Sequence, residues 1–97
     1  MIPLAIPNLS GNEGRYLQEC VTTNFVSSVG PFVDRFEAMV AESAAARHAV
    51  ATSSGTTGLH VALTALGAGR DDLVILPSFT FIASANAIAH CGAVPWL

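Results

Sequence analysis

Residues Ser53 to Gly58 are the stretch whose residue types and spacing point most directly to chemistry, because hydroxyl groups and glycines share one short turn. The segment before it, Ala49-Val50-Ala51, is apolar, and apolar residues after it recur at helical spacing, which predicts a strand, a tight turn and a helix start. Unpaired backbone N–H groups and the positive end of the helix dipole suit a phosphate or carboxylate at such a start. Gly55 and Gly58 let the backbone approach that ligand closely. On spacing alone, an ordinary capped helix start without a ligand remains an open alternative.

Composition argues against several other kinds of site. The chain has 97 residues and a net charge of −3, and its few arginines form no basic stripe, so we expect no nucleic-acid binding. Cys20 and Cys91 lack metal-ligand spacing and are interpreted as reduced core thiols, and the histidines form no ligand pattern, so we expect no metal site. Gly67-Ala68-Gly69 follows a predicted helix instead of a strand, and no Gly-Lys-Ser/Thr sequence is present. The anion therefore belongs to neither a dinucleotide fingerprint nor a P-loop.

The apolar content bears on the compartment and on the extent of the chain. No apolar run approaches the roughly 20 residues of a membrane span, and the amino terminus lacks a basic region followed by an apolar core. We therefore expect a cytoplasmic chain with no membrane partner. A hydrophobic fraction of 52% with only 11% charged residues is rich for a domain that must solvate its own surface. The chain also stops inside the apolar run 93–97, so we expect it to be a truncated part of a larger protein.

Two helices are expected ahead of the turn. The prolines of residues 1–7 favour an extended arm. The capping-box spacing from Ser10 to Glu13, followed by an apolar stripe, predicts a helix over 11–23. A polar loop follows at 24–30, and Pro31 is well suited to open a second amphipathic helix over 31–46.

The rest of the chain alternates between strands and helices. Strands are expected at 48–52, 73–76 and 93–97, with helices at 56–67 and 80–91 between them. We expect the run 73–76 to be buried on both faces, the helix at 80–91 to be buried on most sides and capped by Thr80 or Ser78, and Gly67-Ala68-Gly69 to close the helix before it. Short connections of this kind predict an α/β fold with a mostly parallel sheet, right-handed crossovers and ligands beyond the carboxyl ends of the strands.

Three stretches carry a resemblance to a known family. They are Ser54–Leu63 with Ala65-Leu66-Gly67, Val74–Ala87, and Gly92–Pro95. They resemble the pyridoxal-phosphate-dependent (PLP) sugar aminotransferases of the DegT/DnrJ/EryC1/StrS family over nearly the whole chain. The front end most resembles members that aminate UDP-linked 4-keto-6-deoxy-N-acetylhexosamines for nonulosonic acid synthesis.

The resemblance implies a fold and a division of the chain. Residues 1–97 would be an incomplete PLP-binding large domain of a fold-type I transferase, with helices on both faces of its sheet. Residues 1–47 would supply the arm and two helices, and residues 48–97 a βαβαβ unit. The loop from Phe25 to Gly30 resembles the family's aromatic–Ser/Thr–Gly loop, although Phe25 replaces a more usual Trp and the loop is one residue longer.

The resemblance also implies roles for particular residues. Gly55, Thr56 and Thr57 would hold the cofactor phosphate, and Phe81 would stack on the pyridine ring. Ser27 and Ser28 would lie near the nucleotide-sugar. Taken without the resemblance, Phe81 is more readily a core aromatic, and the two serines are equally well solvated loop hydroxyls.

The groups that the chain lacks bear on its activity. PLP chemistry needs a lysine that holds the cofactor and a carboxylate at the pyridine nitrogen, yet the chain contains no lysine at all. In the resembled family both groups lie beyond residue 97, and a partner subunit completes the site. We therefore expect no catalytic residue in this chain, an inactive fragment, and a homodimeric enzyme in full length that uses glutamate as amino donor.

Two other functions remain open. A sugar dehydratase of the same family, in which the lysine is replaced, would carry the same amino-terminal features. A non-enzymatic α/β module that binds a phosphorylated ligand or a partner protein would also fit the turn.

Overall fold

The computed structural model describes residues 2–3 and 5–97, and the chain divides into two compact units, one up to Ala49 and one from Val50. The two units are described separately. Part of the extended arm expected at 1–7 lies outside the described residues, and the part within them contains neither helix nor strand. None of the helices in the described ranges has the length and apolar character that crossing a membrane requires.

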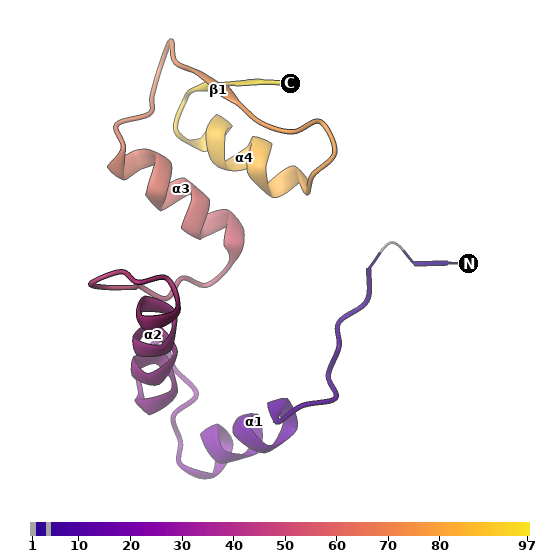
Figure 1. Ribbon diagram of the computed structural model, residues 1–97, viewed down its shortest axis with the longest axis vertical. Coiled ribbons are helices and arrows are strands. Elements are labelled where there is room, and N and C mark those ends of the chain that lie inside the picture. Colours follow the sequence, from indigo (N-terminus) through magenta and orange to yellow (C-terminus); the bar gives the residue numbers. More distant parts are fainter. Residues whose placement is uncertain (1, 4) are drawn as a thin grey trace. The chain divides into compact units, whose positions relative to one another are not determined.

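The first unit contains α1, Glu13–Thr22, and α2, Pro31–Ser43 (Figure 1). Both lie within the predicted ranges, and Pro31 opens α2 as expected. The capping box predicted from Ser10 to Glu13 is wrong, because α1 begins only at Glu13 and its N-cap is Asn12, without a side-chain bond. Ser10 instead folds back on Asn8, whose Oδ1 accepts from the Ser10 N–H at 3.1 Å and from its hydroxyl at 2.7 Å.

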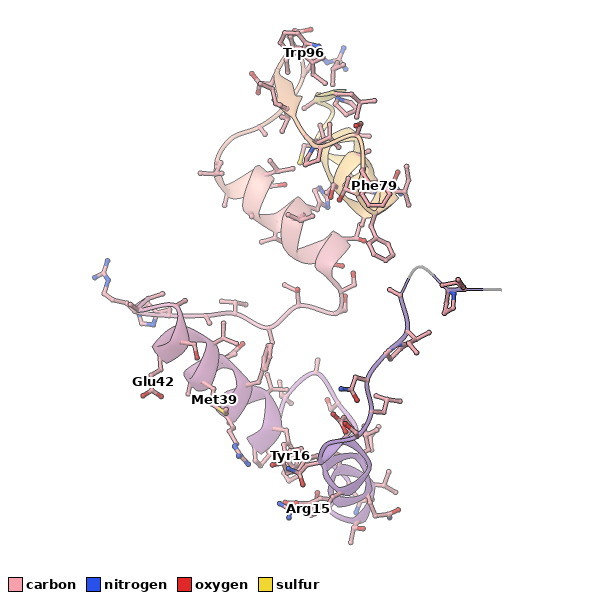
Figure 2. The ribbon with its side chains drawn as sticks, turned by 45° about the vertical axis from the view of Figure 1, so that its right-hand side comes forward. Arg15, Tyr16, Met39, Glu42, Phe79 and Trp96 are labelled. Carbon is pink, nitrogen blue, oxygen red and sulfur yellow. The ribbon has the colours of Figure 1, made fainter. Side chains whose placement is uncertain are left out.

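Tyr16 is the centre of the contact between α1 and α2. Its ring lies 5.3 Å from that of Phe32, centroid to centroid, with the planes tilted by 49°. The guanidinium carbons of Arg15 and Arg35 lie 5.2 and 5.6 Å from the Tyr16 centroid, within the range of cation–π attraction. Figure 2 shows Arg15 and Tyr16 on α1. Phe36 and Met39 continue the apolar face of α2 and remain more than half exposed.

The end of α2 differs from the prediction. The run Ala44-Ala45-Ala46 favours helix, yet α2 ends at Ser43 because Ala45 adopts a left-handed conformation with φ of 50°. The N–H of Ala45 donates to the Glu42 carbonyl at 3.1 Å, and that of Ala46 to the Ala41 carbonyl at 2.9 Å, which closes the helix end. The chain then turns back, so that residues 47–49 and α2 line one cavity.

The second unit contains two helices and a two-stranded parallel sheet. Its elements are α3, Gly55–Ala65; β1, Leu73–Ile75; α4, Ile82–His90; and β2, Val94–Trp96. Leu73 pairs with Val94 and Ile75 with Trp96, and the Leu76 N–H extends the ladder to the Trp96 carbonyl at 3.0 Å. The parallel pairing of β1 and β2 around α4 confirms the predicted α/β class.

The strand predicted at 48–52 is wrong for the described part of the chain. The sheet consists of β1 and β2, and residues 48–52 lie outside it, in neither a helix nor a strand. Val50 is 82% exposed. An apolar run becomes a strand only when a neighbouring backbone pairs with it, and the described residues place no strand beside this run.

The core of the second unit lies on one face of the sheet. Leu76, Ala87, Ile88 and Ala93 are buried, and Leu63, Val74 and Ala85 pack around that cluster. Alternate strand residues point the other way, so Leu73 is 60% and Ile75 78% exposed. The expectation that 73–76 is buried on both faces is therefore wrong here, because packing against the described residues covers one face only.

The helix predicted at 80–91 is also less covered and differently capped than expected. Only Ala87 and Ile88 of α4 are buried, and Ile82 is 71% exposed. Its N-cap is Phe81, with no side-chain cap bond, so neither Ser78 nor Thr80 serves as the predicted cap. Thr80 precedes the cap by one residue, and its hydroxyl lies 3.3 Å from that of Ser84.

Candidate functional site

The turn before α3 is built by Ser54. This residue has extended backbone angles, φ −164° and ψ 163°, and its hydroxyl accepts from the Thr57 N–H at 3.2 Å. Its carbonyl accepts from the Gly58 N–H at 3.0 Å, which starts the helix. Gly55, Thr56 and Thr57 therefore form the first turn of α3, and the first N–H groups of a helix have no acceptor within it.

The hydroxyl groups of the turn differ in their hydrogen-bond partners. Thr57 Oγ1 lies 3.2 Å from Ser53 Oγ and 3.0 Å from Ser54 Oγ. The Thr52 hydroxyl donates to the Ser54 carbonyl at 3.1 Å. The Thr57 hydroxyl is thus engaged in the cap itself, as the capped-helix alternative requires.

The turn nevertheless fits an anion. A Cβ added at Gly55 would meet no atom within 4 Å, so no neighbouring group crowds the first residue of α3 on that side. A Cβ at Gly58 would instead lie 3.1 Å from Thr52 Oγ1, so this glycine keeps the turn close to the helix. The first turn contains no carboxylate that would repel an anion.

Phe81 lies at the start of α4, two residues beyond Phe79. It is 78% exposed, which does not match the alternative of a core aromatic. Leu59, the fifth residue of α3, and Ser84, the third residue of α4, line one cavity of about 190 Å³ together with Pro77. The first turns of α3 and α4 therefore lie near the carboxyl end of β1, as the directions of these elements in Figure 1 also show.

Ser27 and Ser28 lie in the first unit, in the exposed loop between α1 and α2. The loop is closed by Gly30, whose φ is 140° and whose added Cβ would lie 2.9 Å from Phe25 Cδ1. Phe25 thus packs directly on the glycine that precedes α2. The structure groups Gly55, Thr56, Thr57 and Phe81 in the second unit and holds the two serines in the first.

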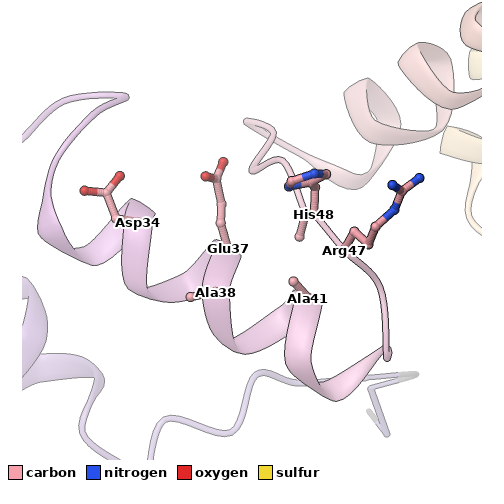
Figure 3. A pocket seen from close by; sticks show the side chains of 7 residues that line it. Asp34, Glu37, Ala38, Ala41, Arg47 and His48 are labelled. Atoms are coloured by element: carbon pink, nitrogen blue, oxygen red, sulfur yellow. The ribbon is translucent and has the colours of Figure 1, made fainter.

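A polar cavity of the first unit was not anticipated from the sequence. Asp34 and Glu37 on α2 and Arg47 and His48 on the returning segment line about 260 Å³ over a floor of alanines (Figure 3). The i, i+3 spacing of the two acids is a sequence signal that they share one polar face of α2. Ala45 has a left-handed conformation and thereby brings Arg47 and His48 back along that face. A run of alanines gives no sequence signal for this conformation.

These features define the class of the chain: an α/β segment with a helix start suited to a phosphate at the carboxyl end of a parallel strand. The model of the DegT/DnrJ/EryC1/StrS aminotransferase family matches residues 7–97. The chain belongs to this family, which confirms the resemblance.

Two similar proteins are named GDP-perosamine synthase. The chain is 50% identical over 96 residues to a GDP-perosamine synthase of Caulobacter vibrioides, covering 99% of this chain and 26% of the relative. It is 48% identical over 95 residues to a GDP-perosamine synthase of Vibrio cholerae, covering 98% and 26%. The chain thus spans about a quarter of the length of these relatives.

Solved structures agree with this assignment. An aminotransferase from Psychrobacter cryohalolentis superposes with a TM-score of 0.80 at 35% identity, over 96% of this chain and 24% of that one. The PLP form of a protein described as a sugar aminotransferase from Streptococcus pneumoniae superposes with a TM-score of 0.76 at 30% identity, over 98% and 24%. The same protein is also solved in a PMP form, which supports PLP as the family's cofactor.

Proposed function

We propose that the whole protein is a PLP-dependent aminotransferase that transfers an amino group, with glutamate as donor, to a GDP-linked keto-sugar. The observation that carries this proposal is the family match combined with the uncrowded, acid-free helix start at Gly55. The relatives named GDP-perosamine synthase favour a GDP-linked substrate over the UDP-linked one that the front end first indicated.

In this proposal, the residues of the chain bind the cofactor and orient it. Gly55 and Thr56 are the first residues of α3, so their backbone N–H groups have no acceptor within the helix and would hold the phosphate, with the Thr56 hydroxyl as a further donor. Thr57 would act through its N–H and its cap bonds. Phe81 would lie against the pyridine ring and exclude water from that face.

The remaining groups come from elsewhere. When bound, PLP supplies an electron sink that lets an amino group be exchanged for a ketone oxygen. The lysine and the carboxylate that this chemistry needs are absent from the site described here and would come from the rest of the protein. Ser27 and Ser28 would contact the nucleotide-sugar, and a homodimer in the cytoplasm remains our expectation for the whole protein.

The substrate proposal is tested with the purified whole protein, PLP and glutamate. The GDP-linked keto-sugar precursor of perosamine and a UDP-linked 4-keto-6-deoxy-N-acetylhexosamine are supplied separately, and amino-sugar product is measured by mass spectrometry. We expect product with the GDP-linked sugar. Product from the UDP-linked sugar alone would restore the nonulosonic acid assignment, and loss of the sugar hydroxyl without amination would indicate the dehydratase.

A further inference from the structure

Two histidines that are far apart in the sequence meet where α3 packs against α4. The ring centroids of His60, on α3, and His90, the last residue of α4, are 5.6 Å apart, with the planes tilted by 38°. His60 is half-buried and His90 is exposed. The pair is therefore held at the helix contact on one side and open to solvent on the other.

The distance between these ring centroids is close to that of two imidazoles bound to one metal ion. With metal–nitrogen bonds of about 2.0 to 2.1 Å and a tetrahedral or slightly wider angle at the metal, the two ring centroids lie roughly 5 to 5.5 Å apart. The observed 5.6 Å is close to this value. Since His90 is exposed, its ring can turn to direct a nitrogen toward the ion without disturbing the core.

The surroundings of His60 hold one half of the pair in place. The Thr64 hydroxyl donates to the His60 carbonyl at 2.8 Å, and the Cys91 thiol donates to the same carbonyl at 3.8 Å. Cys91 Sγ also lies 3.6 Å from Thr64 Oγ1. Through Cys91, the backbone of His60 therefore contacts the residue that directly follows α4.

The electrostatic environment of His90 also favours a cation. His90 occupies the last turn of α4, where the negative end of the helix dipole attracts positive charge. Within residues 2–3 and 5–97, no group of three His, Cys, Asp or Glu side chains is placed to hold a metal. His60 and His90 would thus be the two ligands that this chain supplies to the ion.

We propose that His60 and His90 bind a divalent transition-metal ion, such as Zn²⁺ or Cu²⁺, that bridges α3 and α4. The inference is independent of the proposed aminotransferase activity. Both helices carry residues assigned to the cofactor at their starts, so the ion would brace the two elements that present Gly55 and Phe81. Neutral imidazoles favour Cu²⁺ and Zn²⁺ over Mg²⁺ or Ca²⁺, which prefer oxygen ligands.

The test uses the purified whole protein with PLP bound, titrated with ZnCl₂ by calorimetry and with CuCl₂ by electron paramagnetic resonance. The chain offers a matched control, because His48 is also exposed and lies in the other unit. We expect Zn²⁺ binding to weaken at least tenfold in His90→Gln and to be unchanged in His48→Gln. The Cu²⁺ spectrum should show two nitrogen ligands in the wild type and lose one in His90→Gln.

His60→Gln provides a second arm and should weaken Zn²⁺ binding like His90→Gln. If this half-buried substitution prevents folding, His90→Gln decides alone, since His90 is exposed. A wild-type protein that binds no Zn²⁺, or a His90→Gln variant that binds it as tightly as the wild type, would overturn the proposal and leave the pair as a packing contact between two rings.

Discussion

Thr56 and Thr57 are adjacent residues with the same side chain, yet the structure distinguishes them. Thr57 Oγ1 is within 3.2 Å of Ser53 Oγ and within 3.0 Å of Ser54 Oγ, so its hydroxyl serves the cap. The sequence predicts the turn because glycines and hydroxyls follow an apolar run. The sequence does not predict which of the two threonine hydroxyls serves the cap, since either threonine is chemically able to bond a phosphate or a serine.

The two threonines therefore give separable predictions for the whole protein. Replacing both, Thr56→Val with Thr57→Val, should lower PLP affinity at least tenfold, because a charge-assisted hydrogen bond contributes about 1.5–3 kcal/mol. Most of that loss should appear in Thr56→Val alone. Thr57→Val should instead lower the free energy of unfolding by about 0.5–1.5 kcal/mol through loss of the cap bonds. Titration of the apo-protein with PLP, and urea unfolding, measure the two effects.

Ser54→Ala is the control for the cap. It should cost about 1 kcal/mol of stability by removing the acceptor of the Thr57 N–H. If the double threonine variant binds PLP like the wild type, the turn is only a capped helix start.

The Phe81→Ala variant should remove the stacking on the pyridine ring of PLP and leave the binding of its phosphate in place. The phenyl ring is 78% exposed in the described structure, so its removal should alter the absorption spectrum of bound PLP and slow turnover while the phosphate stays anchored. The exposed Phe79 offers a matched control, since Phe79→Ala removes a similar ring two residues away. Equal spectra for Phe81→Ala and the wild type would argue against stacking.

At the scale of the elements, the four helices of the described residues end in the same way. Each is followed by a residue with positive φ, namely Asn24 at 61°, Ala45 at 50°, Gly67 at 83° and Gly92 at 82°. Asn and Gly adopt this conformation readily, whereas alanine pays a steric penalty for its Cβ. The ends of α1, α3 and α4 were therefore predictable to within two residues, and the end of α2 was not.

Ala45→Gly should stabilise the protein. Relief of the left-handed alanine is worth about 1 kcal/mol, and the bonds that close α2 should be unchanged. Urea unfolding followed by circular dichroism measures the gain. Ala44→Gly is the matched control, because Ala44 has φ of −88° and should lose stability. A destabilised Ala45→Gly would contradict the strained turn.

The strands show that a local apolar pattern does not by itself determine where a strand forms. The run Leu73-Val74-Ile75-Leu76 correctly predicts β1, and Gly92 correctly marks the break before β2. The range 48–52 contains the shorter apolar run Ala49-Val50-Ala51, and no strand lies beside it among the described residues. Strand formation depends on a partner elsewhere in the chain, which a local pattern does not contain.

At the scale of the whole molecule, the sheet exposes an apolar face. Leu73, Ile75, Val94 and Trp96 are each more than half exposed, and Figure 2 labels Trp96 on this sheet. Water-exposed apolar surface of this kind favours association. The sequence indicated this outcome through its high hydrophobic content, although it did not indicate which face would be uncovered.

The 97-residue chain produced by itself should therefore aggregate or fail to unfold cooperatively. Sedimentation velocity and urea unfolding measure both properties. Ile75→Thr should raise the soluble fraction, because it removes an apolar side chain from the exposed face and keeps a β-branched residue in β1. A monodisperse, cooperatively folding monomer would instead favour the free-standing binding module.

The close approach of Gly58 to Thr52 makes two positions interdependent in evolution. An alanine at 58 would gain helix propensity of about 1 kcal/mol, but its Cβ would lie 3.1 Å from Thr52 Oγ1. The gain should appear only where residue 52 has lost its hydroxyl, and a double-mutant cycle of Gly58→Ala with Thr52→Ala should show favourable coupling. Among homologous sequences, the two positions should consequently vary together, with a Cβ-bearing residue at 58 accompanied by a smaller one at 52.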